Sequence, residues 1–324
     1  MSKAARATRG REATALDIRS RYRGAMLGLA VGDALGASIE FSCHPHYAPV
    51  FDLQGGGPHD LLPGQFTDDT SMALCLADSL LARHGFDAED QLRRYVGWWR
   101  DGLRSSTGAC FDIGGTTRDA LRKFERSPGP QCGSEDPMEA GNGSIMRLAP
   151  IPLFFRKDPG AAIAYAAKSS RTTHGAREAV DACRYLAALT LGALEGTAKP
   201  NLLAPGYSPV AALWRAEPLA QRIDGIARGD YKPKRPPEID GGGYVVSSLA
   251  SALWAFHHGD TFLGGLYLAV NLGNDSDTTG AVYGQLAGAY YGVEAIPLEW
   301  RNAVERWAAI TDVADDLYAH SEAL

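Results

Sequence analysis

Apolar residues recur along most of the chain at the three- and four-residue spacing of amphipathic helices. The segment AREAVDACRYLAALTLGALEG at 176–196 shows this spacing clearly. Helices are predicted at about 69–84, 88–103, 115–125, 159–169, 175–195, 208–217, 243–258, 261–271, 279–291 and 298–322. Stretches rich in Pro and Gly interrupt them at 42–66, 126–143, 196–209 and 226–243, and no set of alternating strands is visible. We therefore predict an all-α fold, a compact single-domain helical bundle with long functional loops.

A further helix is predicted in RYRGAMLGLAVGDALGASIEF at 21–41. Its glycines at 24, 28, 32 and 36 repeat every fourth residue, so they line one face and let another helix approach closely. Asp33 and Arg23 exclude a membrane span. The pattern therefore favours a helix buried inside the bundle.

Length, composition and charge exclude several classes of function for this chain. The 324 residues are 45% hydrophobic, which suffices for a large core. The net charge is −6, whereas nucleic-acid-binding proteins usually carry a basic excess, so we expect no nucleic-acid partner. No run approaches the roughly 18 apolar residues of a membrane span, and the first residues lack the apolar core of a signal peptide. We expect a cytoplasmic protein without membrane contact.

Residues 1–20 differ from the rest of the chain because five basic side chains there face only two acidic ones. We expect a flexible basic tail, followed by one domain at 21–324. The alternative is an arm that reaches a partner.

The five cysteines, at 43, 75, 110, 132 and 183, are scattered and form no C-x-x-C motif. They are expected to be free thiols in a reducing compartment. Cys43, His44 and His46 form the one Cys/His cluster, but a zinc site would need a fourth ligand, so we expect none there.

Two short acidic motifs each open an apolar helix: TDDT at 67–70 and NDSDTTG at 274–280. Helix capping is the simpler explanation, because such side chains satisfy free N–H groups and the helix dipole favours anions. Capping needs one or two residues, however, and each motif carries two Asp residues and several hydroxyls. Adjacent carboxylates repel one another unless a cation lies among them.

If the two motifs meet in space, four carboxylates come together, and Glu40 at the end of the first helix could add a fifth. One divalent ion would leave this site strongly anionic, whereas two would nearly balance it, so the charge favours a two-metal site. Hard oxygen ligands suit Mg²⁺, Mn²⁺ or Ca²⁺ better than zinc.

Three further segments combine turn residues with polar side chains: FDIGGTTRDAL at 111–121, GNGSIMRLAP at 141–150 and SSRTTHGAREAV at 169–180. Turns of the first two kinds point backbone N–H groups outward, which suits phosphate, although a capped helix with a Gly turn explains them equally well. His174 could be structural or functional. Tyr244, after three glycines, could offer a stacking face in a lid. No G-x-S-x-G or H-E-x-x-H motif is present, which disfavours serine hydrolases and zincins.

Together these motifs resemble the ADP-ribosylglycohydrolase family, whose members are all-α enzymes. The matching pieces, in the family's order, are GAMLGLAVGDALGASIEF, GQFTDDTSMAL, FDIGGTTRDAL, GNGSIMRLAP, THGAREAV, GGGYVVSSLASALWAF and LAVNLGNDSDTTGAVYGQLAGAYYG. They cover about residues 21–300. The basic tail and the loop KPKRPPEI at 232–239 depart from the family's pattern.

The resemblance implies site residues as well as an activity. The implied ligands of two divalent cations, Mg²⁺ or else Mn²⁺, are Thr67, Asp68, Asp69, Asp275, Asp277 and Thr278. Glu40 and Asp112 would lie at the reacting end, and sequence does not separate their roles. The positions implied around bound ADP-ribose are Gly114, Asn142, Gly143, Ser144, Ile145, Met146, His174 and Tyr244.

The implied activity is metal-dependent removal of ADP-ribose from a modified protein. The FDIG and GNGSIMRLAP elements look more like the arginine-directed bacterial branch, while ADP-ribosyl-serine and ADP-ribose esters remain alternatives. A second hypothesis is an immunity protein that neutralises an ADP-ribosyltransferase toxin through the basic tail. An inactive relative and a metal phosphatase are further alternatives.

Overall fold

The structure is a computed structural model that describes residues 17–43 and 46–323, and most of these residues are helical. The helices are α1 (Ile18–Gly36), α2 (Asp68–Arg83), α3 (Ala88–Asp101), α4 (Gly115–Arg126), α5 (Pro150–Phe154), α6 (Pro159–Arg171), α7 (Arg177–Leu194), α8 (Lys199–Leu202), α9 (Leu213–Ala216), α10 (Gln221–Arg228), α11 (Val245–His258), α12 (Phe262–Val270), α13 (Ser276–Tyr291), α14 (Leu298–Ala303) and α15 (Trp307–Ala323). Short 3₁₀ turns lie at Ala37–Ile39, Gly57–His59, Pro137–Glu139 and Val293–Ala295. Within the described ranges, β-structure is limited to three isolated bridges. The predicted all-α fold is confirmed.

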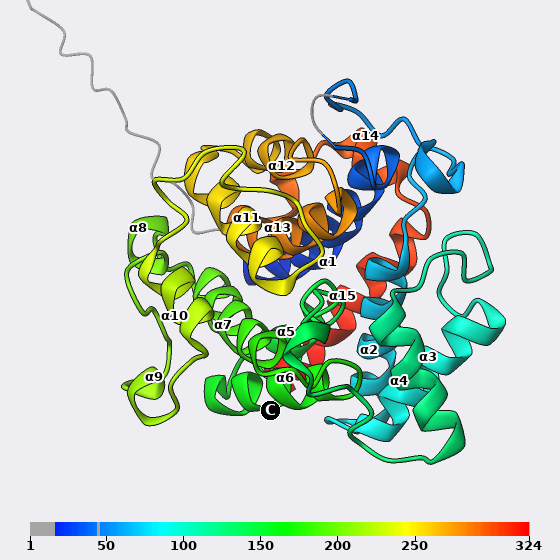
Figure 1. The fold of residues 1–324 in the computed structure, drawn as a ribbon, viewed down its shortest axis with the longest axis vertical. Coiled ribbons are helices and arrows are strands. Elements are labelled where there is room, and N and C mark those ends of the chain that lie inside the picture. The colour runs from blue at the N-terminus through cyan, green and yellow to red at the C-terminus, as the bar shows by residue number, and fades with distance from the viewer. Residues whose placement is uncertain (1–16, 44–45, 324) are drawn as a thin grey trace, which may run out of the picture.

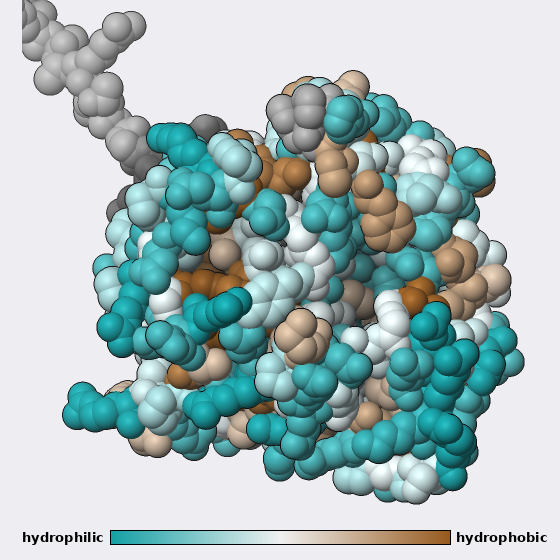
Figure 2. Space-filling model, in the orientation of Figure 1, coloured by the Kyte–Doolittle hydropathy of each residue, from teal (hydrophilic) through white to brown (hydrophobic). Residues whose placement is uncertain are grey.

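Helices α1 and α13 lie side by side and antiparallel in the middle of the molecule (Figure 1). Helices α7, α11 and α12 pack on α13, and α15 packs on α1. One continuous hydrophobic core runs through these helices and α2. The face drawn in Figure 2 is mostly hydrophilic, with hydrophobic residues in small separate groups.

Glycines on both helices explain how closely α1 and α13 approach. The predicted series in α1 faces a second four-residue series in α13, at 280, 284 and 288. A Cβ atom on Gly32 would lie 2.1 Å from the carbonyl oxygen of Gly280, well inside van der Waals contact. The prediction that this face allows close helix approach is therefore confirmed, and the crossing brings the end of α1 against the start of α13.

Two predicted helices differ from the observed ones. The segment predicted at 208–217 is helical only in α9, because Ser208 and Pro209 lie in a turn before it. The segment predicted at 298–322 is divided into α14 and α15 at Arg306, whose φ is +59°. Helices α5, α8 and α10 were not predicted, because they are too short to show a full amphipathic period.

Several other expectations depend on residues near the N-terminus. Helix α1 begins at Ile18, with Asp17 as its N-cap. Residues 1–16, which hold most of the basic tail, and His44 lie outside the described residues, so the tail and the domain boundary stay predictions. The five cysteines are unpaired, as expected. In the part of the chain that the structure describes, no helix has the length and apolar content needed to cross a bilayer.

Candidate active site

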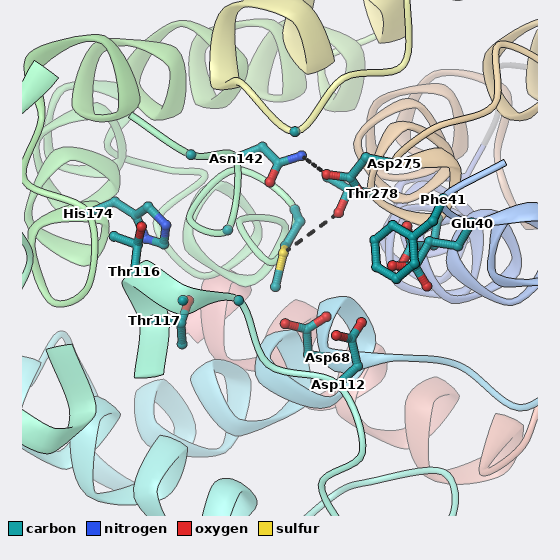
Figure 3. A pocket seen from close by; sticks show the side chains of 17 residues that line it. Glu40, Phe41, Asp68, Asp112, Thr116, Thr117, Asn142, His174, Asp275 and Thr278 are labelled. Carbon is teal, nitrogen blue, oxygen red and sulfur yellow. Dashed lines mark hydrogen bonds between the residues drawn. The ribbon is translucent and has the colours of Figure 1, made fainter. Parts of the chain in front are cut away.

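A single pocket collects most of the predicted site residues from seven separate segments. Its walls come from the segment that follows α1 and its 3₁₀ turn, the starts of α2, α4 and α13, the loop at 141–146, and the residues His174 and Gly243. In Figure 3, carboxylates gather at one end of the pocket, and Asn142, His174 and two threonines form the other. The pocket is therefore divided into an acidic end and a neutral polar end.

The two acidic motifs meet at the acidic end. The Thr67 hydroxyl lies 3.2 Å from Asp69 Oδ2 and 3.2 Å from Asp277 Oδ2, so it links both motifs. Thr278 Oγ1 lies 3.4 Å from Asp69 Oδ2. Carboxylate oxygens of Asp68, Asp112 and Asp277 lie within 4.8 Å of one another. Five of the six predicted ligand positions thus lie in one buried cluster, and the sixth, half-buried Asp275, lines the same pocket.

Capping does not account for these carboxylates. The N-cap residues of α2 and α13, Thr67 and Asp275, make no side-chain capping hydrogen bond. Asp33 on α1 caps the start of α2 instead. Its carboxylate accepts hydrogen bonds from the backbone N–H groups and the hydroxyls of Thr67 and Thr70, at 2.6–3.0 Å. Sequence reasoning missed this role of Asp33, because no local motif connects it with residues 34 and 37 positions later.

The residues at the acidic end fit divalent cations. Asp69 is fully buried and Asp277 is 2% exposed, and one oxygen of each lacks a hydrogen-bond donor. Burial, followed by the charges of neighbouring carboxylates, raises the pKa of Asp68, Asp69 and Asp277 well above the usual range. Deprotonated carboxylates without donors at this depth need a cation among them.

Glu40 and Asp112 approach the acidic cluster from two different loops. Glu40 is 5% exposed, and its Oε2 atom has no hydrogen-bond partner. Burial, with added repulsion from Asp112, Asp275 and Asp33, raises the pKa of Glu40 to about 9. Burial also raises the pKa of Asp112, while His59 opposes the shift.

His59 is a neighbour of this pair that sequence reasoning missed. Its Nε2 atom lies 3.2 Å from Glu40 Oε2 and 3.8 Å from Asp112 Oδ2, although the first contact lacks the alignment of a hydrogen bond. The ring packs against Phe111, with centroids 5.2 Å apart. His59 follows three glycines with positive φ, at 55–57, and that local signal could have marked an unusual loop.

The neutral end is built around close contacts to Gly143. A Cβ atom there would lie 2.8 Å from the His174 ring and 3.2 Å from the Thr117 hydroxyl, so only glycine leaves room for both. Asn142 donates from Nδ2 to Asp275 Oδ2 at 2.8 Å, which connects the two ends of the pocket. Helix α4 begins at Gly115 beside this wall, and its N-cap residue Gly114 makes no side-chain cap. Its first N–H groups are therefore available to an anion.

A hydrogen-bond chain fixes the proton position on His174. Arg147 Nη2 donates to Thr173 Oγ1 at 2.6 Å, and Thr173 Oγ1 lies 2.8 Å from His174 Nδ1. The Thr173 hydroxyl has no other acceptor among the described residues, so its proton is satisfied when it is donated to Nδ1, an arrangement that leaves Nε2–H to face the pocket. Burial lowers the pKa of His174 to about 3, with a further contribution from the Arg147 charge. His174 is thus a neutral donor.

Comparison with known proteins identifies the family. Residues 14–323 match the family described as ADP-ribosylglycohydrolase. The chain belongs to the ADP-ribosylglycohydrolase family. The predicted resemblance is confirmed, and the family is one of hydrolases.

Relatives of this ADP-ribosylglycohydrolase include proteins with assigned names. The chain is 42% identical to "ADP-ribosylarginine hydrolase Tri1" of Pseudomonas putida (strain GB-1), over 92% of this chain and 78% of that protein. It is 33% identical to "ADP-ribosyl-[dinitrogen reductase] glycohydrolase" of Rhodospirillum rubrum, over 90% of this chain and 92% of that protein. A solved structure titled "ADP-ribosylglycohydrolase-related protein complex" matches with a TM-score of 0.83 and 45% identity, over 94% of this chain and 99% of that one.

The predicted ADP-ribose contacts of this ADP-ribosylglycohydrolase do not all line the pocket. Gly114, Asn142, Gly143, Met146 and His174 do. Two others face away from it: Ser144 accepts a hydrogen bond from Ser170 at 2.9 Å, and Ile145 is fully buried in the core. Tyr244 lies outside the pocket lining, where its hydroxyl donates to Glu178 and accepts from Arg222. The assignment of all eight predicted positions as ADP-ribose contacts stays a prediction.

Proposed function

We propose that this chain hydrolyses the bond between ADP-ribose and a modified arginine side chain in a metal-dependent reaction. The observation that carries the proposal is the division of one pocket into an end with buried carboxylates and an end with backbone amides and neutral donors. Cleavage of a glycosidic bond develops positive charge at C1 of the ribose, which suits the acidic end. The diphosphate suits the start of α4 and the neutral His174.

The arginine linkage is supported by two relatives. The proteins of Pseudomonas putida and of Serratia proteamaculans (strain 568), 42% and 38% identical to this chain, are both named ADP-ribosylarginine hydrolases. Each is matched over 92% of this chain, which includes both acidic motifs. The substrate proposed here is accordingly a protein with ADP-ribosylated arginine.

The roles proposed for the side chains follow from their positions. Glu40 and Asp112 are the two groups that can move a proton at the bond to be cleaved, since both lie beside the cluster and carry raised pKa values. Asn142 orients Asp275, and Arg147 with Thr173 orients His174. Two divalent cations, Mg²⁺ or Mn²⁺, held by the six predicted ligands would supply charge stabilisation and orientation of the ribose hydroxyls.

The test is release of ADP-ribose from defined substrates. The purified protein is incubated with an arginine-ADP-ribosylated protein, a serine-ADP-ribosylated peptide and an ADP-ribose ester, each with Mg²⁺, with Mn²⁺ or with EDTA. We expect release from the arginine substrate that EDTA abolishes. Release that survives EDTA would refute the metal dependence, and release from serine or ester alone would refute the arginine linkage.

The alternative role, binding to an ADP-ribosyltransferase toxin, depends on the basic residues before residue 17. These lie outside the described residues, so that role stays a prediction. Deleting residues 1–16 tests it, because hydrolysis should persist while toxin binding is lost.

A further inference from the structure

Phe41 is an apolar side chain at the acidic end of the pocket with no place in the core. It is 64% exposed, and it lines the pocket beside Glu40. In Figure 3 the ring stands next to Glu40, across from Asp68 and Asp112. A phenyl ring beside several carboxylates does not add to their solvation, and at this exposure its face is open to contact with a ligand in the pocket.

The backbone holds Phe41 in a conformation that phenylalanine rarely adopts. Its φ is +59°, in the left-handed region that favours glycine. Two backbone hydrogen bonds of 2.6 Å fasten the segment, from Phe41 N to Asn274 O and from Asn274 N to Ser42 O. Asn274 directly precedes Asp275, so the ring is tied to the loop that opens α13. Strained backbone kept in place by such contacts is typical of ligand sites.

The surroundings of the ring match the chemistry of one leaving group. The His59 ring stands edge-on to Phe41 at 6.4 Å and tilted against Phe111 at 5.2 Å, so Phe41 belongs to a small aromatic cluster at the edge of the pocket. The carboxylates of Glu40 and Asp112 lie within 3.8 Å of His59 Nε2, and Glu40 Oε2 is buried without a hydrogen-bond donor. A guanidino group is planar, carries a delocalised positive charge, stacks on aromatic faces and donates to carboxylates.

We propose that Phe41 recognises the acceptor side of the substrate by stacking on the arginine guanidino group, and so selects arginine-linked ADP-ribose over neutral linkages. This inference rests on the proposed function. A serine or ester linkage offers no positive charge to the ring, and the serine linkage has no flat group either. Phe41 is therefore a specificity-determining residue, distinct from the carboxylates that handle protons.

The experiment compares two small substrates on the Mg²⁺-loaded enzyme. ADP-ribosylagmatine carries the guanidino group without a protein, and an ADP-ribose ester lacks that group. Phe41→Leu keeps an apolar side chain and removes the π face, Phe41→Gly removes the ring and relieves the positive φ, and Phe41→Tyr keeps the ring. Phe51→Ala is the matched control, since Phe51 is 59% exposed and lies outside the pocket lining.

We expect kcat/KM for ADP-ribosylagmatine to fall about tenfold in Phe41→Leu and Phe41→Gly, in the range of a partly desolvated cation–π contact. Phe41→Tyr and Phe51→Ala should stay near the parent, as should ester hydrolysis and the calorimetric affinity for ADP-ribose in all variants. An equal fall on both substrates, or no fall on either, overturns the inference. So does a fall confined to an intact protein substrate, which would place Phe41 against the carrier protein instead. If the parent enzyme cleaves no arginine linkage, the proposed function fails first.

Discussion

At each end of the pocket, one buried charged side chain holds its neighbours in position. Asp33 accepts four hydrogen bonds from Thr67 and Thr70, and these oppose the effect of burial, which raises its pKa to about 6. With the start of α2 satisfied by Asp33, the carboxylates of Asp68 and Asp69 remain available for the pocket. At the other end, Arg147 is fully buried, and its guanidinium stacks over the Tyr95 ring at 4.6 Å.

The first prediction concerns the hydrogen-bond chain from Arg147 to His174. Thr173→Val keeps the shape of the side chain and removes the hydroxyl, so Nδ1 loses its donor and Nε2–H is no longer enforced. We expect ADP-ribose to bind about tenfold more weakly, the cost of one hydrogen bond that is no longer pre-oriented. Titration calorimetry measures the affinity, and ¹⁵N NMR of the His174 ring reports the tautomer.

Thr173→Ser is the control for this change, because it restores the hydroxyl. It should bind ADP-ribose like the parent and show the same ring tautomer. If Thr173→Val keeps the parent's affinity and tautomer, the chain does not orient His174, and the imidazole is held by packing alone.

At the scale of elements, the crossing of α1 and α13 is what assembles the acidic end. The glycines let the two backbones touch, and the antiparallel direction sets Asp33 and Glu40 beside the start of α13. A Cβ atom on Gly36 would lie 2.4 Å from the backbone nitrogen of Asp277. The same close contact therefore also holds Asp33, which binds the start of α2, against the start of α13.

Gly32→Ala tests that crossing. The added methyl would meet the Gly280 carbonyl oxygen at 2.1 Å, and neither backbone can yield without moving a helix. Overpacking of this kind costs about 3 kcal/mol or more, against a gain of about 1 kcal/mol in helix propensity. We expect the free energy of unfolding in urea to fall by about 2 kcal/mol, and the stabilisation by Mg²⁺ to fall with it.

Gly85→Ala is the matched control for Gly32→Ala, since nothing lies within 4 Å of a Cβ atom there. It should leave unfolding nearly unchanged. A Gly32→Ala protein as stable as the parent would mean that the helices can separate without cost, and that the crossing does not fix the site.

At the scale of the whole molecule, sequence predicted what is encoded locally. The helices and the two acidic motifs were found because each is a continuous pattern of a few residues. Asp33, Phe41 and His59 were missed because their significance depends on contacts with segments far away in the chain. The resemblance implies Ser144 at the ligand, and in the structure its hydroxyl accepts from Ser170, so that contact stays a prediction. Neighbouring positions in a motif thus face opposite ways, which only the fold reveals.

The carboxylates clustered at the acidic end of the pocket also make the stability of the folded protein depend on pH. Asp68, Asp69, Asp277 and Glu40 have folded-state pKa values above their usual ones, with Glu40 at about 9. The metal-free folded state therefore holds protons that the unfolded chain has released. Their stabilising effect is complete below about pH 4 and is lost as the pH rises through the folded-state values. Between pH 7.0 and 8.5 the buried thiols of Cys75, Cys110 and Cys183, whose pKa values burial also raises, act in the same direction, so the carboxylate contribution is read from the difference between variants.

In that window we expect the unfolding temperature of the EDTA-treated protein to fall as pH rises. The slope is about 1.4 kcal/mol per pH unit for each proton retained. Mg²⁺ should reverse the trend, because cation binding requires deprotonated ligands and strengthens with pH.

Asp277→Asn removes one charge from the cluster, so the pH dependence of its metal-free stability should flatten and its stabilisation by Mg²⁺ should shrink. Asp316→Asn, at an exposed position on α15, should behave like the parent. A metal-free protein that gains stability from pH 7.0 to 8.5 would mean that the cluster is ionised without a cation, and the argument for metal ions at this site would fail.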